Sequence, residues 1–157
     1  MKALIQRVTH AELSVNGALV SSVQRGYLVF LGVQKGDTRE QAEYLAAKTA
    51  KDLHVQAYPP RAKLRIFEDE NGKINRSVLE VGGEALAVSQ FTLLANASHG
   101  NRPDFLEAEV PALAEPLYDC YCESLRACGV PVKKGIFGAD MKIELLNDGP
   151  FTILLEK

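Results

Sequence analysis

The residue types that most often perform catalysis are present in this chain, but none of them has the spacing of a known catalytic motif. The histidines His10, His54 and His99 lie far apart, with no Cys, Asp or Glu at a metal-binding interval. A Gly-x-Ser-x-Gly motif and a phosphate-binding glycine loop are both missing. Thr92 carries a hydroxyl, but a threonine nucleophile needs an adjacent base, and the sequence offers none. The sequence therefore predicts neither a metal nor a cofactor.

The glutamate and aspartate run Glu68-Asp69-Glu70 and the three cysteines are equally weak candidates. A solvated turn is the better interpretation of the acidic run, because charged side chains are usually exposed. Cys120, Cys122 and Cys128 fall mostly on the apolar side of an expected helix, where small buried side chains are the rule.

Two unusual segments remain. Ser89-Gln90 places polar side chains inside a strongly apolar segment, and Gly149-Pro150 interrupts another. Proline cannot donate a hydrogen bond to a sheet, and the bond before it is the one peptide bond that becomes cis at low cost. Taken alone, residues 147–152 fit either an ordinary turn between two strands or a backbone wedge whose carbonyl groups face a ligand.

The segments that position these residues are mostly short and apolar, as is typical of strands. The Asn16-Gly17 pair predicts a tight hairpin within the second strand. We expect strands at residues 2–8, 12–23, 27–33, 64–67, 77–81, 85–94, 130–132, 141–146 and 151–155. Together with two helices, these predict an α/β domain with helices packed on a sheet.

Both helices are predicted from periodicity and capping residues. Asp37 and Glu40 have the spacing of a capping box before the first helix. Pro111 suits the start of the second, whose apolar side chains recur every three or four residues, and Gly129 suits its end.

Length and composition predict one soluble domain comprising residues 1–157. Apolar residues make up 46% of the chain and charged residues 24%, and no segment approaches the length of a membrane span. We expect no membrane partner and a cytoplasmic location, because three crowded cysteines make a poor disulfide framework. A net charge of −2 gives no overall attraction to nucleic acid.

Six segments, in order along the chain, are similar to those of the D-aminoacyl-tRNA deacylases, and the resemblance covers residues 1–157. The pair Ser89-Gln90-Phe91-Thr92-Leu93 and Asn147-x-Gly149-Pro150-x-Thr152 is its most specific part. The other segments are Gln6-Arg7-Val8, Leu64-Arg65-Ile66-Phe67-Glu68-Asp69, Gly100-Asn101-Arg102-Pro103 and Phe137-Gly138-Ala139-Asp140-Met141.

The resemblance implies a three-layer fold in which mixed and antiparallel strands form barrel-like sheets with two main helices on one side. It implies hydrolysis of the ester that joins a D-amino acid to the 3′ end of tRNA, and removal of glycine mischarged on tRNA-Ala. It also implies a homodimer in which Gly149 and Pro150, joined by a cis bond, reach the partner's active site and exclude L side chains. The activity is translational proofreading and needs no metal or cofactor.

The resemblance also assigns roles to individual residues. Phe91 and Thr92 would act mainly through backbone N–H groups that stabilise an oxyanion, beside Gln90, with the ribose 2′-hydroxyl assisting. Arg7 would brace Gly149 and Pro150, and Ser89 and Asn147 are further supporting residues of the site. Phe137 and Met141 would contact the terminal adenosine; a core position is an equally good interpretation of Phe137.

Two departures from the family pattern stand out. Residues 51–62 have the character of a surface insertion, and Phe151 stands where the family usually has valine. Two other functions remain open: a sister deacylase with a trans Gly-Pro that acts on misacylated L-aminoacyl-tRNA, and a catalytically silent tRNA-binding dimer. Ser89, Gln90 and Arg7 argue against the sister enzyme, and the intact motifs argue against the silent protein.

Overall fold

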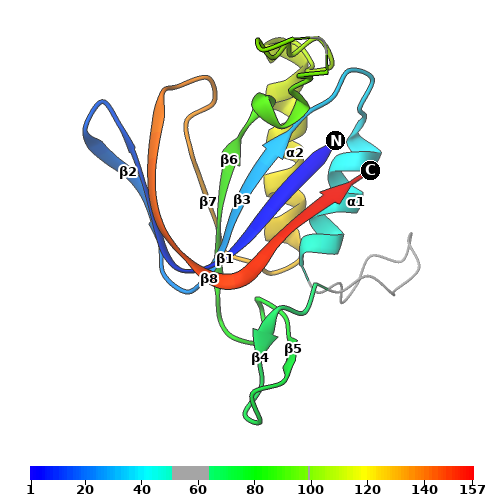
Figure 1. Cartoon of the computed structure of the whole chain (residues 1–157). Helices are drawn as coiled ribbons and strands as arrows, with labels where there is room; N and C mark the ends of the chain where they lie inside the picture. Colours follow the sequence, from blue (N-terminus) through cyan, green and yellow to red (C-terminus); the bar gives the residue numbers. More distant parts are fainter. Residues whose placement is uncertain (51–63, 99) are drawn as a thin grey trace.

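A computed structural model describes residues 1–50, 64–98 and 100–157 of the chain (Figure 1). The expected insertion at residues 51–62 lies outside the described residues. The strands are β1 (Lys2–Val15), β2 (Ala18–Val23), β3 (Gly26–Gly32), β4 (Phe67–Glu68), β5 (Ile74–Arg76), β6 (Glu84–Ser89), β7 (Val132–Lys134) and β8 (Met141–Glu156). The helices are α1 (Arg39–Thr49), the 3₁₀ turn η1 (Phe91–Leu94) and α2 (Pro111–Ala127).

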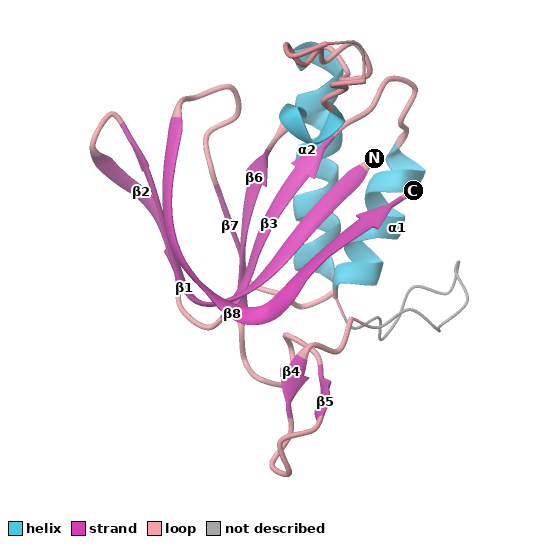
Figure 2. Ribbon diagram, in the orientation of Figure 1, coloured by secondary structure: helices cyan, strands magenta, loops and turns pink. Residues whose placement is uncertain are grey.

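The main sheet is mixed and contains six strands. Its order is β2-β1-β3-β6-β7, and β8 pairs with β1 along the other edge of that strand. The β3–β6 and β6–β7 pairs are parallel, whereas β1 is antiparallel to β2, β3 and β8. Figure 2 shows β1 and β8 curving strongly together, with α1 and α2 on the same side of the sheet. This confirms the expected mixed, barrel-like fold with two helices on one side.

Strand β8 corrects the expectation of two strands joined by a turn at residues 147–152. It is continuous from Met141 to Glu156 and pairs with nearly the whole of β1. Gln6 faces Thr152 and Val8 faces Asn147, so residues 148–151 form a bulge opposite the single residue Arg7. A bulge of this kind bends a strand and redirects its backbone, which explains the sharp curvature at this point.

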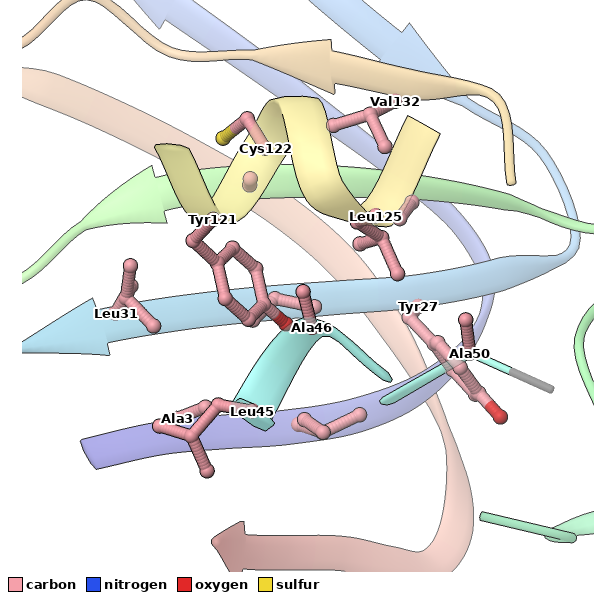
Figure 3. Packing of buried hydrophobic residues seen from close by; sticks show 14 of the residues in the cluster. Ala3, Tyr27, Leu31, Leu45, Ala46, Ala50, Tyr121, Cys122, Leu125 and Val132 are labelled. Carbon is pink, nitrogen blue, oxygen red and sulfur yellow. The ribbon is translucent and has the colours of Figure 1, made fainter. Parts of the chain in front are cut away.

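Two hydrophobic clusters lie on opposite faces of β3 and β6. Alternation along β3 sends Tyr27, Val29 and Leu31 into the cluster beneath the helices, and Leu28 into the other. Figure 3 shows the first cluster, where Tyr121 and Leu125 of α2 approach α1 and the sheet. The second cluster fills the space between β3–β6 and the folded-over halves of β1 and β8. Helices, central strands and folded-over strands therefore form three layers.

Both predicted helices are present, but the first begins one residue later than the predicted capping box. Thr38 is the N-cap, and its capping box is completed by Gln41, not by Asp37 and Glu40. The Asp37 carboxylate instead accepts hydrogen bonds from the backbone N–H of Gln34 and from the amino group of Met1. The second helix begins at Pro111 as predicted and is followed by Gly129 at φ +92°.

Two strand predictions were wrong. Residues 77–81 form turns, in which the Glu80 carboxylate accepts hydrogen bonds from the backbone and hydroxyl of Ser77. The strand expected at residues 85–94 ends at Ser89, and η1 follows. The apolar residues Leu93 and Leu94 suggested a longer strand, but a helical turn that packs on the sheet also needs apolar side chains. A short apolar run therefore does not distinguish the two.

The termini of the described chain lie side by side (Figure 1). No helix in the described part of the chain is long and apolar enough to cross a membrane.

Candidate functional site

A cavity of about 640 Å³ opens where β3 and β6 end. The carboxyl ends of neighbouring parallel strands are a common place for ligand sites, because the chain diverges there. Most of its wall is apolar, and four non-glycine residues of the wall are polar or charged. The lining residues are Leu31, Val33, Val88, Ser89, Gln90, Phe91, Phe105, Ala108, Glu109, Val110, Pro111, Ala114, Phe137, Gly138, Ala139, Asp140, Met141 and Ile143.

The floor of the cavity is fixed by close packing between β3 and η1. The backbone N–H of Gln90 donates to the Leu31 carbonyl at 2.8 Å. A Cβ atom on Gly32 would lie 2.5 Å from Leu94 Cδ2 and 3.1 Å from the Gln90 carbonyl oxygen. Only glycine therefore allows η1 to approach β3 this closely.

A second wall comes from the loop before α2. The backbone N–H of Glu109 donates to the Val33 carbonyl at 2.9 Å, and the N–H of Lys35 donates to the Glu107 carbonyl at 2.9 Å. These bonds attach the loop to the end of β3. The Glu109 carboxylate also accepts hydrogen bonds from the backbone N–H groups of Gly36 and Val110, at 3.3 and 2.9 Å.

Aromatic rings line two sides of the cavity. Phe91 is 58% exposed, and its ring centroid lies 5.0 Å from that of Phe105 in an edge-to-face arrangement. Phe137, which also lines the cavity, is half-buried, and its ring centroid lies 6.0 Å from that of Tyr118. The Tyr118 hydroxyl donates to the Ala87 carbonyl of β6, so this ring pair is anchored to the sheet.

The polar groups beside Phe91 are mainly backbone groups. The Gln90 side chain donates a hydrogen bond to the Thr92 hydroxyl. At the start of η1, the first N–H groups have no acceptor within the turn itself. Phe91 and Thr92 are the first two residues of η1; Phe91 lines the cavity, whereas Thr92 is not one of the lining residues.

The Gly149-Pro150 segment forms a separate cluster that does not line this cavity. Its peptide bond is cis, and both residues are exposed on the bulge of β8. The Arg7 side chain donates to the Asp148 carbonyl at 3.0 Å, and Asn147 Nδ2 donates to the Arg7 carbonyl at 2.9 Å. Within one chain, the two predicted motifs therefore lie at two different places.

Comparison with known proteins decides the family. The sequence profile of the D-Tyr-tRNA(Tyr) deacylase family matches residues 4–156. The chain belongs to the D-aminoacyl-tRNA deacylase family. The resemblance found in the sequence is thereby confirmed, and the chain is a member of a hydrolase family.

Full-length relatives and solved structures agree with this assignment. A D-aminoacyl-tRNA deacylase of Thermomicrobium roseum is 53% identical over 99% of this chain and 94% of its own. One of Ruegeria pomeroyi is 51% identical over 99% of both chains. A solved structure described as a c-Myc DNA unwinding element binding protein has a TM-score of 0.86 at 40% identity, covering 100% of this chain and 99% of its own. A probable eukaryotic D-amino acid tRNA deacylase, at 19% identity, shares the fold with a TM-score of 0.75, over 98% and 97% of the two chains.

Five of the site residues predicted from the deacylase motifs do meet in one cavity. Ser89, Gln90 and Phe91 lie on one wall, and Phe137 and Met141 lie on another. Thr92 is adjacent, whereas Arg7, Asn147, Gly149 and Pro150 are in the bulge cluster.

Sequence reasoning missed the loop wall formed by Phe105, Glu109 and Val110. The one available signal was Phe105 itself, a large aromatic residue at the end of a polar loop.

The charged residues of the cavity wall are both acidic. Asp140 is 80% exposed and pairs with Lys142 at 2.9 Å, whereas Glu109 is half-buried and bound to backbone N–H groups. With no lysine or arginine in the lining, the cavity suits a neutral or cationic group better than a phosphate.

None of the three cysteines is among the residues that line the cavity. Among the described residues, no group of three or more His, Cys, Asp and Glu side chains is arranged to hold a metal ion. Cys122 is fully buried in the helical core, and burial raises the pKa of its thiol to about 11. It is therefore a neutral packing residue and not a thiolate nucleophile.

Proposed function

We propose that the chain hydrolyses the ester between a D-amino acid and the 3′-terminal adenosine of tRNA. The observation that carries this proposal is the 640 Å³ cavity against Ser89, Gln90 and Phe91, in a chain of the deacylase family. Its volume is in the usual range for small-molecule sites. A largely apolar wall with acidic polar groups suits an adenosine and a cationic amino group, while the tRNA phosphates remain outside.

The proposed reaction needs few protein groups, because an aminoacyl ester is already activated. The cavity holds the ester in place, and the backbone N–H groups of Phe91 and Thr92 stabilise the developing oxyanion. The 2′-hydroxyl of the terminal ribose assists the attack of water. Support comes from the position of Phe91 in the wall and from the Thr92 hydroxyl, which is already hydrogen-bonded to Gln90.

The aromatic wall provides for the adenosine. In this proposal Phe137 and Met141 contact the base, and their place in the lining supports that role. Stacking of a base on an aromatic side chain contributes about 1–3 kcal/mol, enough to orient the 3′ end.

Selection against L-amino acids requires a second copy of the chain. Gly149 and Pro150 are exposed and lie outside their own cavity, and Arg7 and Asn147 bind the segment around them. We infer that this segment enters the cavity of the partner subunit, where its carbonyl groups occupy the space that an L side chain would need. Discrimination then rests on steric rejection. Glycine has no side chain to reject, so a glycyl ester is also a substrate.

The outer edge of β8 is the surface that supports a dimer. Within the described part of the chain, β8 pairs only with β1, so its other edge has no strand partner. Leu146 and Leu154 on this strand are 55% and 48% exposed. A long edge with exposed leucines is a natural surface for pairing with another chain. A two-fold dimer would use the same surface on both subunits and create two identical sites.

We propose that the reaction takes place in the cytoplasm. Three free cysteines in the described chain fit a reducing compartment.

One assay tests the function and separates it from its alternatives. The full chain is incubated with matched D- and L-tyrosyl-tRNA, and ester loss is measured. We expect rapid loss of the D-ester alone. Loss of the L-ester alone would support the sister deacylase, and binding without loss of either ester would support a silent tRNA-binding protein.

A mixing experiment tests the shared site. Gly149→Ala alters the loop, and Ala139→Phe fills the cavity wall; each variant is purified separately and the two are allowed to exchange subunits. About half of the dimers would be mixed. In each mixed dimer, one site combines the intact cavity of the Gly149→Ala subunit with the intact loop of the Ala139→Phe subunit, and the other site carries both substitutions. One intact site in half of the dimers should restore about a quarter of wild-type activity. No recovery despite proven exchange would show that the loop and the cavity do not act together across subunits.

A further inference from the structure

Most lysine and arginine side chains in the described part of the chain have a partner within the protein. They pair with a carboxylate, donate to a carbonyl or amide oxygen, or lie over an aromatic ring. The described cations without such a partner are Lys35, Lys73 and Arg102. Exposed cations that the protein itself does not pair are available for an anionic ligand.

Two of these three cations belong to the loop wall of the cavity. Arg102 comes three residues before Phe105, which lines the cavity, so their Cα atoms are at most about 11 Å apart. The backbone N–H of Lys35 donates to the carbonyl of Glu107 in the same loop, at 2.9 Å. Lys73 lies in the turn between β4 and β5, and this hairpin projects from the opposite end of the molecule (Figure 1). Lys35 and Arg102 therefore form a positive rim beside the cavity.

The acidic side chains of the same loop do not neutralise this rim. The Asp104 carboxylate accepts a hydrogen bond from the backbone N–H of Leu106 at 3.1 Å, and that of Glu107 accepts one from the Gln34 side chain at 3.4 Å. Glu109 is bound to backbone N–H groups. Within the described residues, none of these three acids forms an ion pair with a rim cation. The rim thus offers two positive charges next to a cavity wall whose charged residues are acidic.

We propose that Lys35 and Arg102 bind backbone phosphates of the RNA strand whose 3′ end enters the cavity. The proposal rests on the proposed function, in which the terminal adenosine and its ester fill the cavity. The phosphate on the 5′ side of that adenosine is attached to a ribose held inside, so it must lie close to the rim. The acidic groups of the wall repel this phosphate, and the positive rim offsets the repulsion.

The two cations suit different parts of this task. The guanidinium of Arg102 is a flat fork that can bind two oxygens of one phosphate, whereas the ammonium of Lys35 acts as a point charge. The loop that carries Arg102 is closed at its base, where the backbones of Asn96 and Asp104 exchange two hydrogen bonds of 2.9 Å. We therefore expect Arg102 to orient the strand and Lys35 to add attraction.

The test compares D-tyrosyl-tRNA with D-tyrosyl-adenosine, which carries the same ester on a nucleoside without phosphate. Arg102→Gln should raise KM for D-tyrosyl-tRNA about three- to tenfold, and Lys35→Gln about two- to fourfold, with kcat within about twofold of wild type. Neither variant should change kcat/KM for D-tyrosyl-adenosine. Lys73→Gln removes the same charge at the far hairpin, and it should behave as wild type on both substrates.

Salt dependence gives a second measurement that needs only the tRNA substrate. On a single strand, each phosphate contact contributes about 0.7 to the slope of log affinity against log salt concentration. Arg102→Gln should therefore flatten the slope for kcat/KM by about 0.7, and the Lys35→Gln, Arg102→Gln double variant by about twice as much. Arg102→Lys keeps the charge and loses the fork, so it should keep the slope while KM rises.

The outcomes are distinct from those that test the proposed function. A wild-type enzyme that hydrolyses neither D-ester would overturn that function itself. An active wild-type enzyme, with an Arg102→Gln variant that keeps both its KM and its salt slope, would refute only the rim. Equal losses on D-tyrosyl-tRNA and D-tyrosyl-adenosine would also refute it, because Arg102 would then shape the cavity wall. An effect of Lys73→Gln as large as that of Arg102→Gln would show that overall charge, and not the rim, attracts the tRNA.

Discussion

The substitution Gly149→Ala separates the role of the bulge in catalysis from its role in folding. A Cβ atom at this position would have one neighbour within 4 Å, Asn147 Oδ1 at 3.9 Å, which is an ordinary contact. Gly149 is exposed and is not in the left-handed backbone region. Replacing such a glycine stabilises a fold by about 0.4–1 kcal/mol through the unfolded state. The melting temperature should therefore stay level or rise by about 1–4 °C.

Activity should respond in the opposite direction. If the segment enters the partner's cavity, the added methyl group occupies space beside the substrate. Overfilling a packed site costs about 1–3 kcal/mol, which corresponds to a fall in kcat/KM of about 5- to 150-fold. The isolated chain gives no reason for such a loss, because the methyl group makes only an ordinary contact with Asn147 there.

The assay is hydrolysis of D-tyrosyl-tRNA under single-turnover conditions, alongside a melting curve and a measurement of molecular mass. Ala127→Ser, an exposed change at the end of α2, is the control and should behave as wild type. A Gly149→Ala dimer of normal stability with unchanged kcat/KM would refute the argument that this segment reaches a substrate.

Three further predictions follow from the site and the core. Thr92→Ala should lower activity by no more than about 13-fold relative to wild type, which is the effect of losing one hydrogen bond. Loss of a catalytic nucleophile would lower activity by orders of magnitude, and a covalent acyl group trapped on Thr92 would contradict this prediction. Gly32→Ala should destabilise the fold by about 1–3 kcal/mol in urea unfolding and lower activity, because its Cβ would meet Leu94 and the Gln90 carbonyl; unchanged stability would show that η1 yields freely. Cys122 should resist alkylation at pH 8 in the folded enzyme, as mass spectrometry can establish. Since its pKa is raised above the unfolded value of 9.0, the folded state binds the extra proton, and Cys122 should make the free energy of unfolding decrease as the pH rises from 9 towards 11; Cys122→Ala should weaken this decrease.

Local patterns determined most of the elements. The apolar spacing of α2 and the proline at its start located that helix, because both signals depend on neighbours within one or two turns. The motifs around Gln90 and Gly149 identified the family for the same reason, since they are contiguous in sequence. The polar Ser89 and Gln90 in an apolar segment did mark the place where β6 ends and the cavity begins.

Tertiary structure alone decided the bulge and the cavity walls. Residues 148–151 differ from a turn only because β8 keeps pairing with β1 on both sides of them, and that register joins residues about 140 positions apart. The wall at Phe105 and Glu109 exists because hydrogen bonds attach its loop to the end of β3. The stacking of Phe151 on Arg7 also requires β1 and β8 to meet. Periodicity records which face of a segment is buried, but it carries no information about the distant segment that will cover that face.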